Sequence, residues 1–178
     1  RQHDFFAVLR QVEALRPDLP RFGEALRPSQ GALRLGQEPE LDFAPAALAS
    51  FDAGARGAPR LGVRFFGLYG PQGAMPLHFT EYVRERLRFR GDATAARFLD
   101  VFHHRLLSLF YRAWAEARPT VSHDRPDDDY WSERLAAFSG RGQPSLRGKG
   151  LIDGDAVLHF TGHLSAQTRY PDGLKAIL

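Results

Sequence analysis

The stretch that decides the fold is residues 95–118, which read AARFLDVFHHRLLSLFYRAWAEAR. Its apolar side chains recur at steps of three and four, the period of an amphipathic helix. Further large apolar residues, among them Phe98 and Trp114, make this apolar face wider than the stripe of an ordinary surface helix. Asp92 can cap the start, and Pro119 disfavours helical backbone at the residue before it. The sequence therefore predicts one long central helix that needs cover on two sides.

Other helices are indicated by the same period and by their end signals. Asp4 stands where an N-cap is expected, immediately before a first helix over residues 5–15. Pro76 opens a second amphipathic helix, and Gly91 ends it. Shorter helices are predicted over residues 131–138 and from Asp153 to a point before Pro171.

Strand signals are fewer and shorter. Residues 33–35 and 41–43 predict a short strand pair on either side of a turn, and alternation over residues 60–65 predicts a further strand. Residues 45–51 predict a short helix, and the Gly-Pro-Gln-Gly sequence at 70–73 predicts a tight turn. The expected fold class is α+β, mostly helical, with a small antiparallel sheet and one long central helix.

Composition limits the possible classes. The chain has 178 residues, of which 43% are hydrophobic, so it can bury a sizeable core. It has no cysteine, which excludes disulfides and thiolate metal sites, and no apolar run of the length that crosses a bilayer. We expect an N-terminal scaffold domain over residues 1–150 and the start of a following helical segment over 151–178. Because position 1 is not Met and the helical pattern of the last residues is cut short, we expect a piece of a longer protein.

The excess of basic residues raises the alternative of a nucleic-acid-binding domain. The net charge is +3 and the pI is 9.6, and 22 of the 24 basic residues are arginines. The densest cluster places arginines at every second position over residues 84–90, so a helix would split them into two separated pairs. Glu81 and Glu85 lie at distances that allow exposed ion pairs with them. This pattern favours a solvated face over a phosphate-binding stripe.

A metal-dependent enzyme is the second alternative. Asp155, His159 and His163 are spaced by four, so one helix could bring a carboxylate and two imidazoles to one zinc ion. The glutamate that follows the first histidine of a metalloprotease helix is absent, and no P-loop or dinucleotide fingerprint is present. His103 lies near the apolar side of the long helix, where we expect a core histidine satisfied by its neighbours.

Five stretches, taken together and in order, resemble a known family. They are RFGE at 21–24, LGQEP at 35–39, RFFGLYGPQG at 64–73, LHFTEYV at 77–83 and FLDVFHHRLLSLFYRAW at 98–114. The sequence resembles the TssG family of type VI secretion baseplate subunits, also called VasB or ImpH, from the first helix to residues 158–169. It departs from the pattern at Ala74-Met75 and at His104, where an amide is common.

The resemblance implies a structural subunit with no catalytic residues, metal or cofactor. It implies a baseplate wedge in which the subunit bridges two copies of TssF, with TssK and TssE attached nearby, in a contractile assembly in the cytoplasm docked at the inner membrane. Family members are longer, so this chain corresponds to their N-terminal half. With the wide apolar helix, the resemblance predicts that two helices pack against TssF through Phe5, Phe6, Leu9, Phe98, Phe102, Leu106, Phe110 and Trp114.

Overall fold

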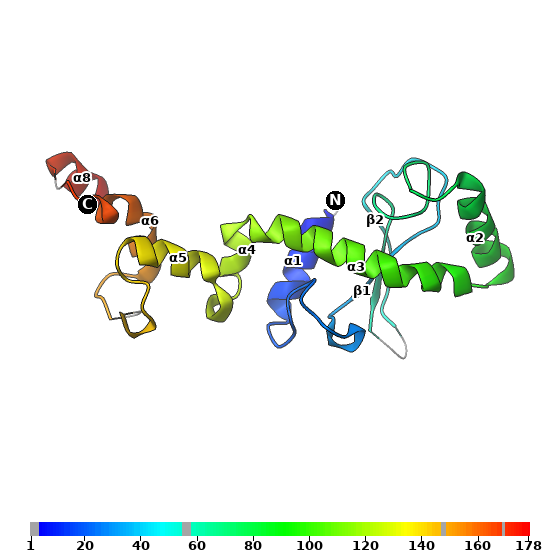
Figure 1. Cartoon of the computed structure of the whole chain (residues 1–178), viewed down its shortest axis with the longest axis horizontal. Helices are drawn as coiled ribbons and strands as arrows, with labels where there is room; N and C mark the ends of the chain where they lie inside the picture. Colours follow the sequence, from blue (N-terminus) through cyan, green and yellow to red (C-terminus); the bar gives the residue numbers. More distant parts are fainter. Residues whose placement is uncertain (1–3, 55–57, 147–148, 169) are drawn as a thin grey trace. The chain divides into compact units, whose positions relative to one another are not determined.

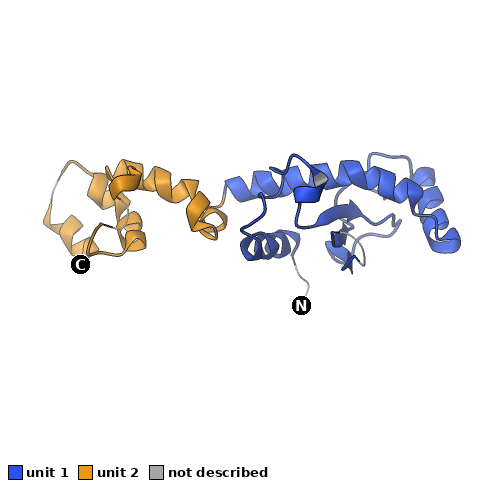
Figure 2. Ribbon diagram, turned by 90° about the horizontal axis from the view of Figure 1, so that it is seen from below, with its two compact units in different colours: residues 1–117 blue, residues 118–178 orange. Residues whose placement is uncertain are grey.

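The computed structural model describes residues 4–54, 58–146, 149–168 and 170–178 (Figure 1). The chain divides into two compact units, residues 1–117 and residues 118–178, which are coloured separately in Figure 2. This boundary lies N-terminal to the one expected at residue 150. Compactness does not test which segments fold by themselves, so the division into domains 1–150 and 151–178 stays a prediction.

The described residues of the first unit form three α-helices, and the ends of α1 and α2 follow the predicted signals. Helix α1 spans Phe5–Leu15, and the Asp4 carboxylate at its start accepts a hydrogen bond from the Ala7 N–H at 3.4 Å. Helix α2 spans Leu77–Arg90, preceded by Pro76 and followed by Gly91. Gly91 has a φ of 63°, the left-handed conformation that glycine adopts at helix C-termini.

Helix α3, Thr94–Glu116, is the predicted long central helix. Asp92 does act at its start, because its carboxylate accepts a hydrogen bond from the Thr94 N–H at 3.0 Å, although Ala93 is the residue at the cap position. The helix ends two residues earlier than predicted, and Pro119 instead begins the next helix. In Figure 1, α3 is the longest helix and passes beside the sheet and α1.

The sheet is small, but it is mixed where an antiparallel sheet was predicted. It contains β1 (Arg34–Gln37), β2 (Leu48–Asp52) and β3 (Arg60–Val63) in the order β1-β3-β2. Strand β3 pairs in parallel with β1, with Leu35 opposite Leu61, and antiparallel with β2. Strand β2 runs in the direction opposite to β1 and β3, and it pairs with β3 at the edge away from β1.

Two local predictions in this region are wrong. Residues 48–52 form β2 and not the predicted helix over 45–51, and no strand forms over 41–43. The apolar and small residues of 45–51 fit a helix as well as a strand, and pairing with β3 decides between them. The predicted turn is confirmed, since the Gly73 N–H donates to the Gly70 carbonyl at 3.0 Å.

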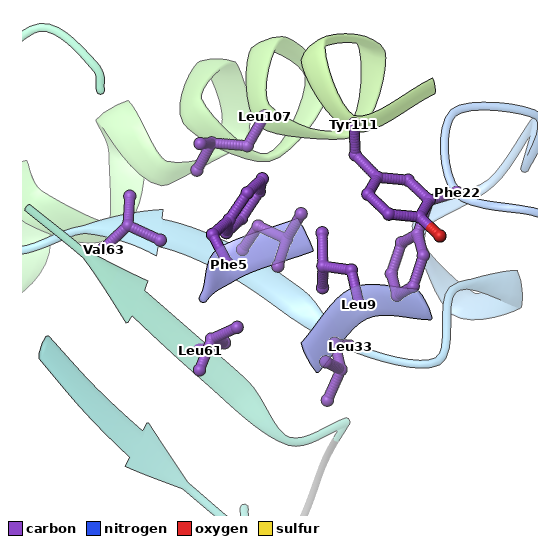
Figure 3. Close-up of a cluster of buried hydrophobic side chains, with 9 residues drawn as sticks. Phe5, Leu9, Phe22, Leu33, Leu61, Val63, Leu107 and Tyr111 are labelled. Carbon is purple, nitrogen blue, oxygen red and sulfur yellow. The ribbon is translucent and has the colours of Figure 1, made fainter. Parts of the chain in front are cut away.

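The core of the first unit lies between α1, α3 and the inner face of the sheet (Figure 3). Leu9, Val63 and Leu107 are completely buried there. The full set of buried residues is Phe5, Leu9, Phe22, Leu33, Leu35, Leu61, Val63, Leu107 and Tyr111. A second, smaller cluster joins α2 to the start of α3 through Tyr69, Val83, Ala96 and Leu99. Helices α1, α2 and α3 therefore all contribute to folding the first unit.

The second unit is helical in its described residues. Its helices are α4 (Pro119–His123), α5 (Tyr130–Phe138), α6 (Gly154–His159), α7 (Thr161–Ser165) and α8 (Pro171–Ile177). Short 3-10 helices occur at Pro126–Asp128 and Pro144–Leu146, and one in the first unit at Pro28–Gln30. The Asp129 carboxylate caps α5 by accepting from the Ser132 N–H at 3.1 Å. The helix predicted from Asp153 is interrupted at Phe160, which divides α6 from α7.

Helices outweigh strands, so the α+β class is confirmed. Within the part of the chain that the structure describes, no helix combines the length and the apolar composition needed to span a membrane.

Candidate functional site

The inward face of α3 carries a partly buried carboxylate, Asp100. Its Oδ1 accepts a hydrogen bond from the Gln37 N–H at 3.2 Å and lies 3.3 Å from Nδ1 of His103. Its Oδ2 accepts from Arg60 at 2.9 Å and from Arg97 at 3.1 Å. Burial opposes ionisation of Asp100, but the hydrogen bond from His103 and the charge of Arg60 outweigh it and hold its pKa below the ordinary value. Asp100 therefore remains an anion that joins α3 to the sheet.

Arg60 connects the Asp100 carboxylate to a second carboxylate, that of Glu38. Its Nη1 donates to Oε1 of Glu38 at 2.6 Å, and Glu38 also accepts from the Ser50 hydroxyl at 2.6 Å. The close approach depends on Gly36, because a Cβ at this position would lie 2.5 Å from Oδ1 of Asp100. The glycine of the 35–39 stretch thus makes room for an ion pair.

The two adjacent histidines of α3 accept hydrogen bonds from the main chain. Nδ1 of His104 accepts from the Leu35 N–H at 3.2 Å, and Nε2 of His103 accepts from the Leu68 N–H at 3.1 Å. His103 is completely buried, which confirms the expected core histidine. Burial and the charges of Arg34 and Arg105 lower the pKa of His104, so its ring stays neutral as an acceptor requires.

Gln37 ties the 35–39 stretch to the 64–73 stretch. Its side-chain nitrogen donates to the Tyr69 carbonyl at 2.9 Å, and its oxygen accepts from the Tyr69 N–H at 2.8 Å. The Tyr69 ring packs edge-on against His103, and burial together with the charge of Asp100 raises the pKa of its hydroxyl to about 12. Three of the stretches that carry the family resemblance therefore meet in one polar network at the inward face of α3.

The RFGE stretch forms a turn that is anchored on both sides. The buried Glu13 of α1 accepts from the Phe22 N–H at 2.9 Å and from the Tyr111 hydroxyl at 3.0 Å. On the other side, Arg105 donates to the Gly23 carbonyl at 2.9 Å. Gly23 has a φ of 87°, which a residue with a side chain rarely adopts. These contacts fix the turn between α1 and α3.

The outward face of α3 carries large apolar side chains that the first unit leaves open. Phe98 is 62% exposed, Val101 68% and Phe102 50%, and three more follow toward the C-terminus at about 40%. We call these six residues the outer stripe: Phe98, Val101, Phe102, Leu106, Leu109 and Phe110. They recur at steps of three and four, so they share one side of the helix. Large apolar side chains that are exposed together on one side of a helix make this side a candidate interaction surface.

At its C-terminal end the outer stripe continues into partly buried aromatic residues. Phe110 stacks on Phe66, with ring centroids 5.1 Å apart, and Phe6 stacks on Trp114 at 4.7 Å. These rings come from α1, α3 and the segment that follows β3. They hold this end of the stripe in place, whereas the N-terminal end around Phe98 is the more exposed.

The model of the family described as "Type VI secretion, TssG" matches residues 1–178. The chain belongs to the TssG family. No curated protein and no solved structure matches it. The protein is therefore a subunit of the type VI secretion baseplate, and its family is a structural one.

The structure separates the residues that the sequence assigned to a TssG partner surface. Phe5 and Leu9 are at most 1% exposed and belong to the core of the first unit (Figure 3), so they do not lie on the exposed surface of this unit. Phe6 and Trp114 are partly buried against each other. The remaining four predicted residues, Phe98, Phe102, Leu106 and Phe110, lie in the outer stripe. Val101 and Leu109, which follow the same helical spacing, also belong to the outer stripe.

The two alternative functions gain no support from the geometry. Asp155 and His159 lie on α6 but His163 lies on α7, beyond the interruption at Phe160. Over residues 4–54, 58–146, 149–168 and 170–178, no three His, Cys, Asp or Glu side chains gather as a metal site would need. The histidine near Asp155 is His123, which is outside the predicted triad; its Nε2 lies 3.6 Å from Oδ2 of Asp155.

The arginine cluster of α2 is largely paired with carboxylates, but not with the predicted ones. Arg84 and Arg88 reach Glu40 at 3.3 and 2.6 Å, and Arg86 pairs with Asp92. These pairs join α2 to neighbouring loops where pairs within the helix were expected. They also reduce the positive charge that a nucleic acid would meet.

Proposed function

We propose that this chain is a scaffold of the baseplate wedge that bridges copies of TssF and helps to recruit TssK and TssE. In this proposal it acts in the cytoplasm, in a baseplate docked at the inner membrane. The observation that carries the proposal is the outer stripe of α3, which holds six large apolar side chains outside the core of their own unit. The proposed occupant of this stripe is TssF.

The physical argument is one of surplus apolar surface. Burying apolar area contributes about 25 cal/mol per Å², and aromatic anchors near the centre of an interface contribute most of its binding energy. Phe98 and Phe102 form an edge-to-face pair with centroids 5.8 Å apart, on a helix whose inward face is fixed to the sheet. A rigid helix loses little conformational entropy on binding, so the stripe is organised for a partner before the partner arrives.

The proposal includes no catalytic turnover. This part is supported by the structural roles of the titratable groups inside the first unit. Asp100, His103 and Glu13 each accept a hydrogen bond from a main-chain N–H group. Metal analysis of the purified chain tests this part. Stoichiometric zinc that survives dialysis, and that disappears when His159 and His163 are changed to Ala, would overturn it.

Co-purification with TssF from the same genome tests the proposed interface. Phe98→Glu places a charge on an exposed residue, so the melting temperature should stay unchanged while TssF capture is lost. Phe89→Glu on α2 is the matched control, since Phe89 is 84% exposed and lies outside the stripe, and it should leave capture intact. If Phe98→Glu changes neither the melting temperature nor TssF capture, the stripe is not the interface.

A further inference from the structure

One border of the outer stripe is basic. Arg97, Arg105 and Arg112 are eight and seven residues apart, so they project from the same side of α3. Arg34 of β1 adds to this border, because it lines one surface cavity together with Arg97, Val101 and His104. The apolar stripe is thus accompanied along one side by guanidinium groups.

Two of these guanidinium groups form no ion pair with a carboxylate in the part of the chain that the structure describes. Arg97 shares Asp100 with Arg60, and Arg112 pairs with Glu116 at 2.7 Å. Arg34 and Arg105, by contrast, form no ion pair with any carboxylate of the described residues, and the hydrogen bond of Arg105 goes to the neutral Gly23 carbonyl. Asp52 also lines the cavity, where its carboxylate accepts a hydrogen bond from the Gly54 N–H.

The outer stripe itself restricts the conformation of its partner. The main-chain N–H and C=O groups in the interior of α3 are bonded to one another, so a chain lying on them finds no backbone partners there. A partner segment has to satisfy its own backbone groups, which a helix does and an extended segment does not. A second copy of this chain is disfavoured, because both copies would carry the same excess of positive charge.

We propose that the outer stripe receives an amphipathic helix whose apolar face is bordered by Asp or Glu, with carboxylates paired to Arg34 and Arg105. This inference rests on the proposed function and deepens it by naming the chemistry of the partner segment. Arginine suits the role, because its planar guanidinium binds a carboxylate through two parallel hydrogen bonds. The apolar contacts supply affinity, and the charged border fixes the register and direction of the bound helix.

The test measures the affinity of the full chain for TssF at about 0.05 M and about 0.5 M salt, where charges are weakly and strongly screened. Arg34→Gln should weaken binding about two- to fivefold at low salt, and Arg34→Glu should weaken it further. Both differences should shrink at high salt. Arg34→Lys retains the charge and should bind more tightly than Arg34→Gln, and Arg90→Gln on α2 is the matched control that should bind as wild type.

The outcomes separate this inference from the proposed function. If Phe98→Glu abolishes binding but Arg34→Glu binds as wild type at both salt concentrations, the charged border plays no part and this inference is wrong, while the interface stands. If neither substitution weakens binding, the proposed interface fails and takes this inference with it. If Arg34→Glu impairs binding to a DNA duplex and leaves TssF binding unchanged, the border serves a nucleic acid and the inference is overturned.

Discussion

The two faces of α3 differ in an unusual way over the first half of the helix, where the inward side carries polar groups beside the buried Ala96 and Leu99 and the outward side carries large apolar groups. Asp100 and His103 point inward to the sheet, whereas Phe98 and Phe102 point outward. Further along, Leu107 on the inward face joins the larger core. The comparison shows what each face does. The inward polar groups complete the fold, and the outward apolar groups are left over from it.

The inward polar groups are there because β1 is an edge strand. It pairs with β3 on one side only, so its other N–H groups need acceptors that are not in the sheet. Asp100 and His104, one turn apart on α3, accept from Gln37 and Leu35 of β1. A buried N–H without an acceptor costs about 1–3 kcal/mol, so polar acceptors at these positions of α3 stabilise the edge of the sheet.

The largest predicted effect is the loss of the Asp100 carboxylate. Asp100→Ala leaves the poorly exposed Arg60 with one carboxylate and the Gln37 N–H without an acceptor. The free energy of unfolding should therefore fall by about 3–5 kcal/mol. Asp42→Ala changes an exposed carboxylate in the same unit and should stay within about 0.5 kcal/mol of wild type. Chemical denaturation measures both. A loss below about 1 kcal/mol for Asp100→Ala would show that the inward network does not hold the fold.

The second prediction compares neighbours in the sequence. Leu107 is completely buried and Leu106 is 41% exposed, so Leu107→Ala should cost about 2–5 kcal/mol through cavity formation and Leu106→Ala less than about 1 kcal/mol. The same denaturation experiment gives both values. Equal losses would mean that the outward face also belongs to a core, and the contrast between the faces would collapse.

Much of this fold can be predicted from the sequence because its signals are local. The helix of 5–15 with its Asp4 cap, the helix closed by Gly91 and the long helix all depend on spacing and end chemistry. The mixed sheet cannot be predicted in this way. Pairing between distant segments decides the direction of β1 relative to β3. It also decides that residues 48–52 form a strand where a helix was predicted, and no local pattern records such pairing.

The candidate site is predictable only in part for the same reason. Spacing identifies which residues share the apolar side of α3, and four of the eight predicted interface residues do lie in the outer stripe. Spacing does not say which side of a helix with apolar residues on both sides meets the core. The sequence places Phe5 among the residues expected to contact a partner, but α1 places its ring between the sheet and α3.

The third prediction concerns His104 and pH. Its pKa is lowered in the folded chain, so the unfolded chain binds a proton more readily than the folded chain does. The stability it contributes is therefore present above about pH 6.5, the ordinary value for histidine, and is lost as pH falls through the lower folded pKa. His104→Ala should cost about 1–2 kcal/mol at neutral pH, because the Leu35 N–H loses its acceptor.

His104→Asn is the matched variant for this prediction. An amide oxygen can accept the same hydrogen bond but does not titrate, so the variant should retain more stability than His104→Ala and should show a weaker fall in stability below pH 6.5. Unfolding curves at several pH values measure this difference. An unchanged pH profile in His104→Asn would assign the acid sensitivity to other groups.

The smallest predicted effect has the opposite sign. Val101 is 68% exposed in the interior of α3, where alanine has a higher helix propensity than valine. Val101→Ala should therefore stabilise the free chain slightly, by up to about 0.5 kcal/mol, while weakening TssF binding. A destabilisation of more than about 1 kcal/mol in thermal unfolding would show that Val101 is packed in the free chain.

The most direct test of the central claim is to measure the accessibility of the outward face in the complex. The chain has no cysteine, so Phe98→Cys, Leu106→Cys and, as a control on α2, Phe89→Cys each introduce a single thiol. The rate of thiol labelling is then measured with and without saturating TssF. We predict that bound TssF slows labelling several-fold at positions 98 and 106 and leaves position 89 unchanged. Equal rates in the free and bound chain at 98 and 106 would contradict the claim that the outward face of α3 binds a partner.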